Sequence, residues 1–129
     1  MKKLLFIVFV FIGINSFGQG IEFFHGTFAE AQAKAKAESK EIFMDFYTSW
    51  CAPCKVMAKK YFVLESVGKA FNKKFVCLKI DGEKGEGPKL VKKYGIKSYP
   101  TLVFIKENGV LIKKVQGLQN EQKLIQLTK

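Results

Sequence analysis

Residues 45–55 of the chain read DFYTSWCAPCK, so that two residues separate the cysteines Cys51 and Cys54. The segment 41–47 is a short apolar run rich in residues that favour β-strands, and a helical stretch is expected from Lys55 to about Tyr61. The cysteines therefore lie where a buried strand passes into a helix. This position puts Cys51 at a helix N-terminus, where free backbone N–H groups and the helix dipole stabilise a thiolate.

The spacing of the two cysteines fits a two-step disulfide exchange. Cys51 is expected to attack a substrate disulfide, and Cys54, one turn further on, to release the product and leave a Cys51–Cys54 disulfide. Pro53 suits the first helical turn, because its missing N–H is not needed there. Trp50 is expected to form an apolar wall beside the site. The dithiol carries the electrons, so neither an organic cofactor nor a metal is expected.

One charged residue, Asp45, interrupts the apolar strand before the cysteines. A carboxylate in such a strand is costly unless it has a task or a partner. Asp45 could accept the Cys54 proton during the second step, which would make it the third catalytic residue. The alternative is a polar residue near the strand end that faces solvent.

The other segments predict one α/β domain without internal repeats. Thr27-Phe28-Ala29-Glu30 matches a capping box and predicts a helix from about Phe28 to Ser39. Asn108-Gly109 is a strong hairpin signal between two β-rich runs. The further expected elements are a short strand at 21–24, a helical segment at 65–71, a strand at 75–81, a helix at 88–94, strands at 101–106 and 110–115, and a last helix from Asn120.

These features resemble the thioredoxin-like thiol-disulfide oxidoreductases. Residues 45–55 look like the active-site stretch of the family, and residues 94–101, YGIKSYPT, look like its second signature, in the correct order. The resemblance covers nearly all of the chain after residue 18. It implies a thioredoxin fold, with a central mixed β-sheet of four to five strands flanked by about four helices.

The resemblance also implies how a substrate binds. The Tyr99–Pro100 bond is expected to be cis, with Pro100 against the disulfide and the Tyr99 backbone free to pair with an extended substrate strand. Gly117, after the last strand, looks like the glycine that leaves room for the substrate. The expected substrate-binding residues are Trp50, Ala52, Pro53, Tyr99, Pro100 and Gly117.

The chain departs from ordinary thioredoxins within the domain. Residues 59–67 interrupt the long second helix and the loop after Asp81 is extended, which is similar to thioredoxin-like domains of transmembrane electron-transfer proteins. Cys77 stands where many thioredoxins keep a lysine, so Asp45 is expected to lack that charge partner. Ala52-Pro53 is similar to reducing thioredoxins, whereas Tyr99 is similar to disulfide isomerases. We expect a reductant, with a disulfide oxidase or isomerase of exported proteins as the alternative.

The first 18 residues have the pattern of a signal peptide. Lys2 and Lys3 precede an apolar run at 4–14, which is shorter than the roughly 20 residues that span a bilayer. Residues 16–18, Ser-Phe-Gly, offer the small residues that a signal peptidase reads. We expect cleavage before Gln19 and a thioredoxin-like domain at 19–129, periplasmic or secreted and not inserted in the membrane. The alternative is an uncleaved N-terminal anchor.

The composition limits the classes of partner. The 129 residues carry a net charge of +11, with 22 lysines and no arginine against 11 acidic residues, and 48% of them are hydrophobic. A single domain with a real core fits these values. The lack of arginine argues against nucleic-acid recognition. The expected partners are client proteins with cysteines or disulfides, and a redox protein that resets the site.

Three alternatives compete with this interpretation. A structural metal site could be assembled from Cys51, Cys54, Cys77 and His25, although a second closely spaced ligand pair is missing. Cys77 could be a third redox thiol, although a lone cysteine in an apolar strand is usually inert packing. A redox-inactive binding module on the same fold would normally lose one active-site cysteine, and both are present.

Overall fold

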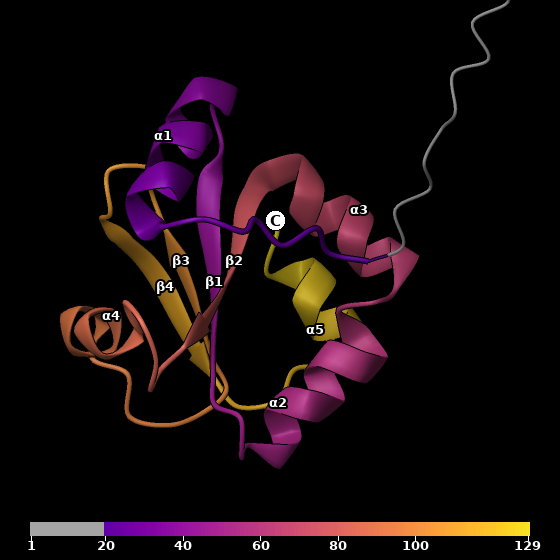
Figure 1. Ribbon diagram of the computed structural model, residues 1–129. Coiled ribbons are helices and arrows are strands. Elements are labelled where there is room, and N and C mark those ends of the chain that lie inside the picture. Colours follow the sequence, from indigo (N-terminus) through magenta and orange to yellow (C-terminus); the bar gives the residue numbers. More distant parts are fainter. Residues whose placement is uncertain (1–19) are drawn as a thin grey trace, which may run out of the picture.

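A four-stranded mixed sheet in the order β2-β1-β3-β4 forms the centre of the structure (Figure 1). This computed structural model describes residues 20–129, and the predicted signal peptide with its cleavage point lies outside the described residues. β1 (Glu41–Tyr47) runs parallel to β2 (Phe75–Asp81) and antiparallel to β3 (Thr101–Ile105), which pairs antiparallel with β4 (Leu111–Gln116). The predicted mixed sheet is therefore confirmed. The expected short strand at 21–24 is reduced to one parallel bridge, between Phe23 and Cys77.

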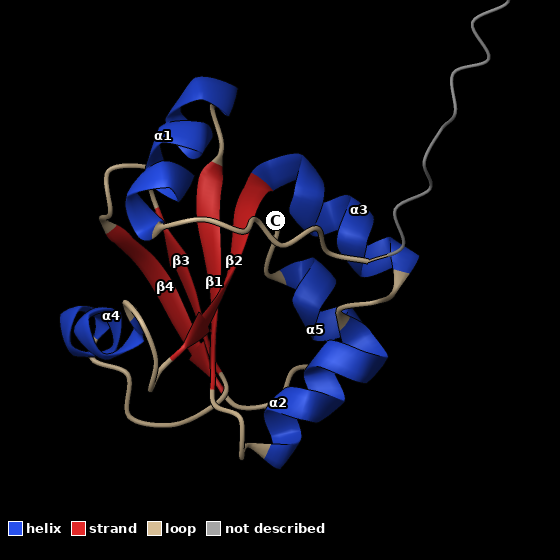
Figure 2. Ribbon diagram, viewed as in Figure 1, coloured by secondary structure: helices blue, strands red, loops and turns tan. Residues whose placement is uncertain are grey.

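Helices cover both faces of the sheet (Figure 2). α1 (Phe28–Glu38) and α4 (Gly87–Tyr94) lie on one face. The other face carries α2 (Ala52–Val56), its π-helical continuation η1 (Met57–Tyr61), α3 (Glu65–Lys74) and α5 (Glu121–Gln126). Within residues 20–129, five α-helices thus flank the sheet, where about four were expected. None of the helices within residues 20–129 has the length and apolar character needed to cross a lipid bilayer.

Local sequence signals set the ends of several helices. The Thr27 hydroxyl accepts a hydrogen bond from the Glu30 N–H and the Glu30 carboxylate accepts one from the Thr27 N–H, so the predicted capping box is present. Asn120 caps α5 through the Lys123 N–H. α4 ends where Gly95 adopts a φ of 62°, a left-handed conformation that glycine reaches without strain.

The predicted interruption of the second helix is confirmed. The helix begins at Ala52, passes into the π-helical turn at Met57 and ends at Tyr61, and the chain then turns before α3 starts at Glu65. Phe62 lies in this break with its ring buried in the core. Its ring packs edge-on against those of Phe23 and Phe43, so the break coincides with a core contact.

The alternation of side chains along β1 divides the core into two layers. Ile42, Met44 and Phe46 pack with α1 and α4 on one face. Phe43 points to the other face, where its ring meets those of Phe62, Phe71, Phe75 and Phe104 at centroid distances of 4.8–6.4 Å. By the same alternation Asp45 lies on the face of Phe43, which is the face that α2 covers.

Candidate active site

The two cysteines of the CxxC stretch form a disulfide at the start of α2. The Cys51–Cys54 bond joins residues whose Cα atoms are 5.3 Å apart, so the predicted pairing is present. Cys51 is the N-cap residue of α2, and its Sγ accepts a hydrogen bond from the Cys54 N–H at 3.2 Å. Pro53 occupies the first turn, as the sequence predicts. Both cysteines are only 3% exposed, so little of the disulfide is open to solvent.

Asp45 is buried beneath this helix and is not a solvent-facing residue, so that alternative is wrong. Its side chain is 1% exposed, and its Oδ2 forms an ion pair at 3.3 Å with the Lys79 ammonium group. Neither carboxylate oxygen has a hydrogen-bond partner among the described residues. Burial raises the pKa of Asp45 from 3.8 to about 6, and Lys79 counteracts part of this rise. The carboxyl group therefore titrates close to neutral pH.

The expectation that Asp45 lacks a lysine partner is also wrong. In the parallel pairing of β1 and β2, Cys77 lies opposite Phe43, and Lys79 lies opposite Asp45. Cys77 and Lys79 share one face of β2, because they are two residues apart. The lysine thus moves two positions along the strand and still reaches the carboxylate. The alternation in FVCLKID could have suggested this, but only once the strand register was known.

A hollow of about 160 Å³ lies beside Cys54, on the Lys79 side of this ion pair. Cys54 and Lys79 both line it, together with Tyr47 and Thr48. The Thr48 hydroxyl is buried without a hydrogen-bond partner among the described residues. Such a group, beside a cavity of this size, is a natural partner for water. The hollow therefore brings Cys54, Thr48 and Lys79 to one space, while Asp45 lies behind Lys79 and does not line it.

The rim of the disulfide is formed by residues from three separate segments. Trp50 is 67% exposed, and its ring lies edge-on to Tyr99 with centroids 6.1 Å apart. The Tyr99–Pro100 bond is cis, and Pro100 is buried while Tyr99 is half-buried. Gly117, at a φ of 85°, donates its N–H to the Pro100 carbonyl oxygen at 2.8 Å, and open space surrounds the place where a side chain would stand. Ala52 and Pro53, which follow Cys51 in the sequence, are both exposed.

Sequence reasoning missed a fourth contributor to this rim. Glu83, in the extended loop after β2, accepts a hydrogen bond from the Trp50 indole N–H. The extension of this loop is visible in the sequence, but nothing in the local pattern indicates that the loop meets the active-site stretch.

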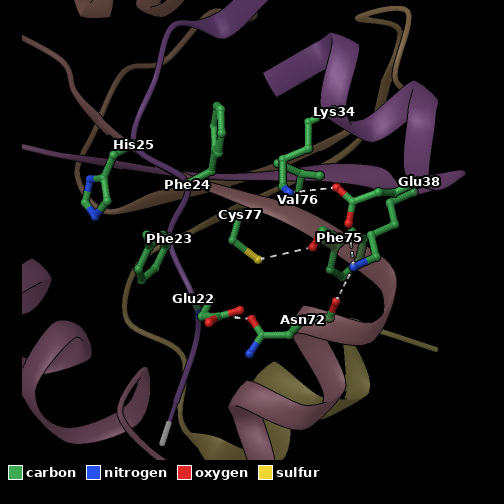
Figure 3. A pocket seen from close by; sticks show the side chains of 11 residues that line it. Glu22, Phe23, Phe24, His25, Lys34, Glu38, Asn72, Phe75, Val76 and Cys77 are labelled. Atoms are coloured by element: carbon green, nitrogen blue, oxygen red, sulfur yellow. Dashed lines mark hydrogen bonds and ion pairs between the residues drawn. The ribbon is translucent and has the colours of Figure 1, made fainter. Parts of the chain in front are cut away.

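The third cysteine, Cys77, lies apart from the disulfide, at a hollow of about 310 Å³ near the beginnings of β1 and β2 (Figure 3). It is a free, buried thiol whose Sγ is 3.8 Å from the Phe75 carbonyl oxygen. Burial raises the pKa of Cys77 to about 12, so the thiol stays protonated at neutral pH and is a poor nucleophile. These properties support the interpretation of Cys77 as packing.

The metal alternative receives no support from this geometry. Within residues 20–129, no three His, Cys, Asp or Glu side chains cluster in a way that could hold a metal ion. Cys51 and Cys54 are bonded to each other instead. Cys77 and His25 both line the hollow in Figure 3, away from the disulfide.

Comparison with known proteins agrees with this site. The family model described as "Thioredoxin-like domain" matches residues 28–129. The chain belongs to the thioredoxin-like family. A thioredoxin-like domain with an intact, disulfide-bonded cysteine pair is a thiol-disulfide oxidoreductase, and the disulfide itself is its redox group.

Individual thioredoxin-like relatives are similar over most of their length. A thioredoxin-like protein of Synechocystis is 35% identical over 99 residues, which are 77% of this chain and 89% of the relative. A solved structure from Bacteroides thetaiotaomicron, described as a candidate disulphide isomerase, is 42% identical with a TM-score of 0.76 and covers 84% of this chain and 90% of its own. The oxidised C-terminal domain of DsbD from Neisseria meningitidis is 25% identical with a TM-score of 0.64, over 77% and 87% of the two chains.

The buried carboxylate gives the thioredoxin-like domain a distinctive dependence of stability on pH. The pKa of Asp45 is higher in the folded protein, at about 6, than its ordinary value of 3.8. The folded protein therefore binds this proton more tightly than the unfolded chain, and Asp45 lowers the free energy of unfolding as the pH rises from about 4 to 6. We predict that Asp45→Asn is more stable than the wild type by about 3 kcal/mol at pH 8. Below pH 4 this difference is expected to disappear.

Urea unfolding of the oxidised proteins between pH 3.5 and 8 measures this difference. The exposed Glu107 provides the control, since Glu107→Gln removes one carboxylate without disturbing the core. A stability difference for Asp45→Asn that is independent of pH would contradict a raised pKa.

Proposed function

We propose that the protein is an exported thiol-disulfide oxidoreductase that reduces disulfides in protein clients. The observation that carries the proposal is the Cys51–Cys54 disulfide at the start of α2, next to Trp50, whose ring contacts Tyr99 ahead of the cis proline. Cys51, Cys54 and Asp45 are its proposed catalytic residues. The structure contains the oxidised form, which is the form left after a client has been reduced.

In the first step, the reduced enzyme attacks a client disulfide with the Cys51 thiolate. The Cys54 N–H already points at Cys51 Sγ, and the same hydrogen bond would stabilise the negative charge of the thiolate. A bond forms between Cys51 and one client sulfur, and the other client sulfur leaves as a thiolate. The product of this step is a mixed disulfide.

In the second step, Cys54 attacks Cys51 Sγ and releases the client. Cys54 must lose its proton to do so, and Asp45, with a pKa of about 6, can receive it through the cavity that Cys54 shares with Lys79. The Cys51–Cys54 disulfide forms, and the client leaves with both sulfurs reduced. Two electrons have passed to the client, so a separate redox partner must reduce the enzyme again.

The client is proposed to bind as an extended strand over the rim. The Tyr99 backbone would pair with it by β-augmentation, with Pro100 behind the disulfide and the space beside Gly117 left free. Trp50 and Tyr99 would contact its side chains, and the exposed Ala52 and Pro53 would flank the cysteine under attack.

The surroundings of Cys51 support the reducing direction. A disulfide becomes strongly oxidising when the protein stabilises its reduced thiolate form. Within residues 20–129, the hydrogen bond from the Cys54 N–H is the one that reaches Cys51 Sγ, and Ala52 and Pro53 supply no polar side chain. The thiolate is thus only modestly stabilised.

Disulfide isomerisation is the second candidate function. The relative from Bacteroides thetaiotaomicron is described as a candidate disulphide isomerase and is 42% identical to this chain. Isomerisation uses the same first step, but Cys51 would then spend longer in the mixed disulfide while the client rearranges.

We predict opposite outcomes for the two cysteine variants. Cys51→Ser should abolish reduction of insulin, a convenient protein disulfide, because the nucleophile is lost. Cys54→Ser should retain the first step but not the second, and should accumulate a mixed disulfide with insulin that non-reducing gels and mass spectrometry detect. Cys77→Ser is the matched control and should keep nearly full activity. An active Cys51→Ser variant would contradict the assignment of the nucleophile.

The export part of the proposal rests on residues 1–18 and has its own test. When the full chain is expressed in a Gram-negative bacterium, the protein in the periplasmic fraction should begin at Gln19, as shown by N-terminal sequencing. Phe9→Lys places a charge in the apolar run and should leave the chain in the cytoplasm with residues 1–18 attached. Wild-type protein that keeps Met1 and stays in the cytoplasm would contradict export.

A further inference from the structure

The indole of Trp50 occupies an unusual position for a large apolar side chain. It is 67% exposed in the loop between β1 and Cys51, so packing against the core does not fix it. An unrestrained side chain would lose rotamer freedom each time a client bound against it. The structure nevertheless provides two specific contacts to the ring.

The first contact comes from the extended loop after β2. The Trp50 indole N–H donates a hydrogen bond to the Glu83 carboxylate. The second contact is the edge-on packing of Tyr99, with the two ring planes at 87°. Trp50 is thus held between a carboxylate and the aromatic residue that precedes the cis proline.

The parallel pairing of β1 and β2 explains why Glu83 reaches this place. The last residues of the two strands, Tyr47 and Asp81, lie opposite each other, so the loops that follow leave from the same end of the sheet (Figure 2). Trp50 is three residues beyond one strand, and Glu83 is two residues beyond the other. The extended loop is therefore placed beside the active-site stretch.

Several bonds keep this loop in one conformation. The Gly82 N–H donates to the Tyr47 carbonyl oxygen at 2.9 Å, and the Glu83 N–H donates to the Asp81 carboxylate at 2.9 Å. A Cβ atom at position 82 would lie 2.2 Å from the Tyr99 hydroxyl oxygen, so a larger residue there would displace the Tyr99 side chain. The Glu86 carboxylate accepts the Phe28 N–H at 2.9 Å and ties the loop to α1. These bonds therefore hold Glu83 in a fixed position beside Trp50.

We propose that Glu83 is a positioning residue for client binding, because its carboxylate fixes the Trp50 indole against Tyr99 and so prepares an apolar wall beside Cys51. This inference rests on the proposed function, in which protein clients dock over Trp50 and Tyr99. Glu83 contacts neither sulfur, so it should affect how clients bind and not the exchange itself. Burial raises the pKa of Tyr99, and the charges of Glu83 and Asp81 raise it further, which agrees with a shared cluster.

The test uses the purified protein and the fact that Trp50 is its single tryptophan. Time-resolved fluorescence anisotropy should show little fast motion of Trp50 in the wild type and a new subnanosecond component in Glu83→Ala. Glu83→Gln keeps an acceptor oxygen and should restore most of the restraint. Glu107→Ala removes an exposed carboxylate on a different loop and should match the wild type.

Steady-state kinetics with two disulfides separate positioning from chemistry. For insulin, Glu83→Ala should raise KM by about three- to tenfold, the range expected for one lost hydrogen bond, while kcat changes by less than about twofold. For Ellman's reagent, a small disulfide that does not need the wall, the rate should stay within about twofold of the wild type.

Two outcomes would overturn the proposal. One is wild-type anisotropy in Glu83→Ala, and the other is an equal loss of rate with insulin and with Ellman's reagent, which would indicate a general structural effect. A wild-type protein that reduces neither disulfide would refute the proposed function instead. The anisotropy comparison would still decide whether Glu83 holds Trp50.

Discussion

β1 is bonded to a neighbouring strand along both of its edges, and this constraint fixes the position of the active site. β2 pairs with it from Glu41 to Tyr47, and β3 pairs with it from Ile42 to Phe46. A central strand held in this way cannot shift its register without moving the side chains of both core layers. The last residue of β1 therefore defines where the loop to Cys51 begins. The N-terminus of α2, the disulfide and Trp50 all take their positions from it.

The same strand sets the electrostatics of the site. Its alternation directs Asp45 to the face that α2 covers, and its register with β2 puts Lys79 opposite that carboxylate. Burial disfavours the charged carboxylate, and the lysine keeps the pKa from rising further. The result is a buried carboxyl group with a pKa of about 6, which suits the proton-accepting role that we propose for it. The same burial lowers the free energy of unfolding of the domain at high pH.

The sequence was informative where a feature depends on neighbours along the chain. The four strands, the Thr27–Glu30 capping box and the CxxC pair at a strand-to-helix junction follow from local patterns. The partner of Asp45 did not, because Lys79 is 34 positions further along the chain and meets Asp45 only through the register between two strands. The contact of Glu83 with Trp50 depends on the same register and on the shape of the extended loop. Side-chain pairs between distant segments carry no local periodicity, so the fold was easier to predict than the surroundings of the disulfide.

The reduction potential of the Cys51–Cys54 pair tests the central claim, that this disulfide is a redox-active centre poised for reduction of clients. Residues 19–129 would be equilibrated with glutathione and dithiothreitol buffers, and the thiols alkylated and counted by intact mass. The account predicts one reversible two-electron transition near the potential of thioredoxin, about −270 mV, with Cys77 unchanged throughout. A potential of about −120 to −180 mV, as in strong oxidants and isomerases, would contradict the reducing direction. The absence of a reversible transition would contradict the redox role itself.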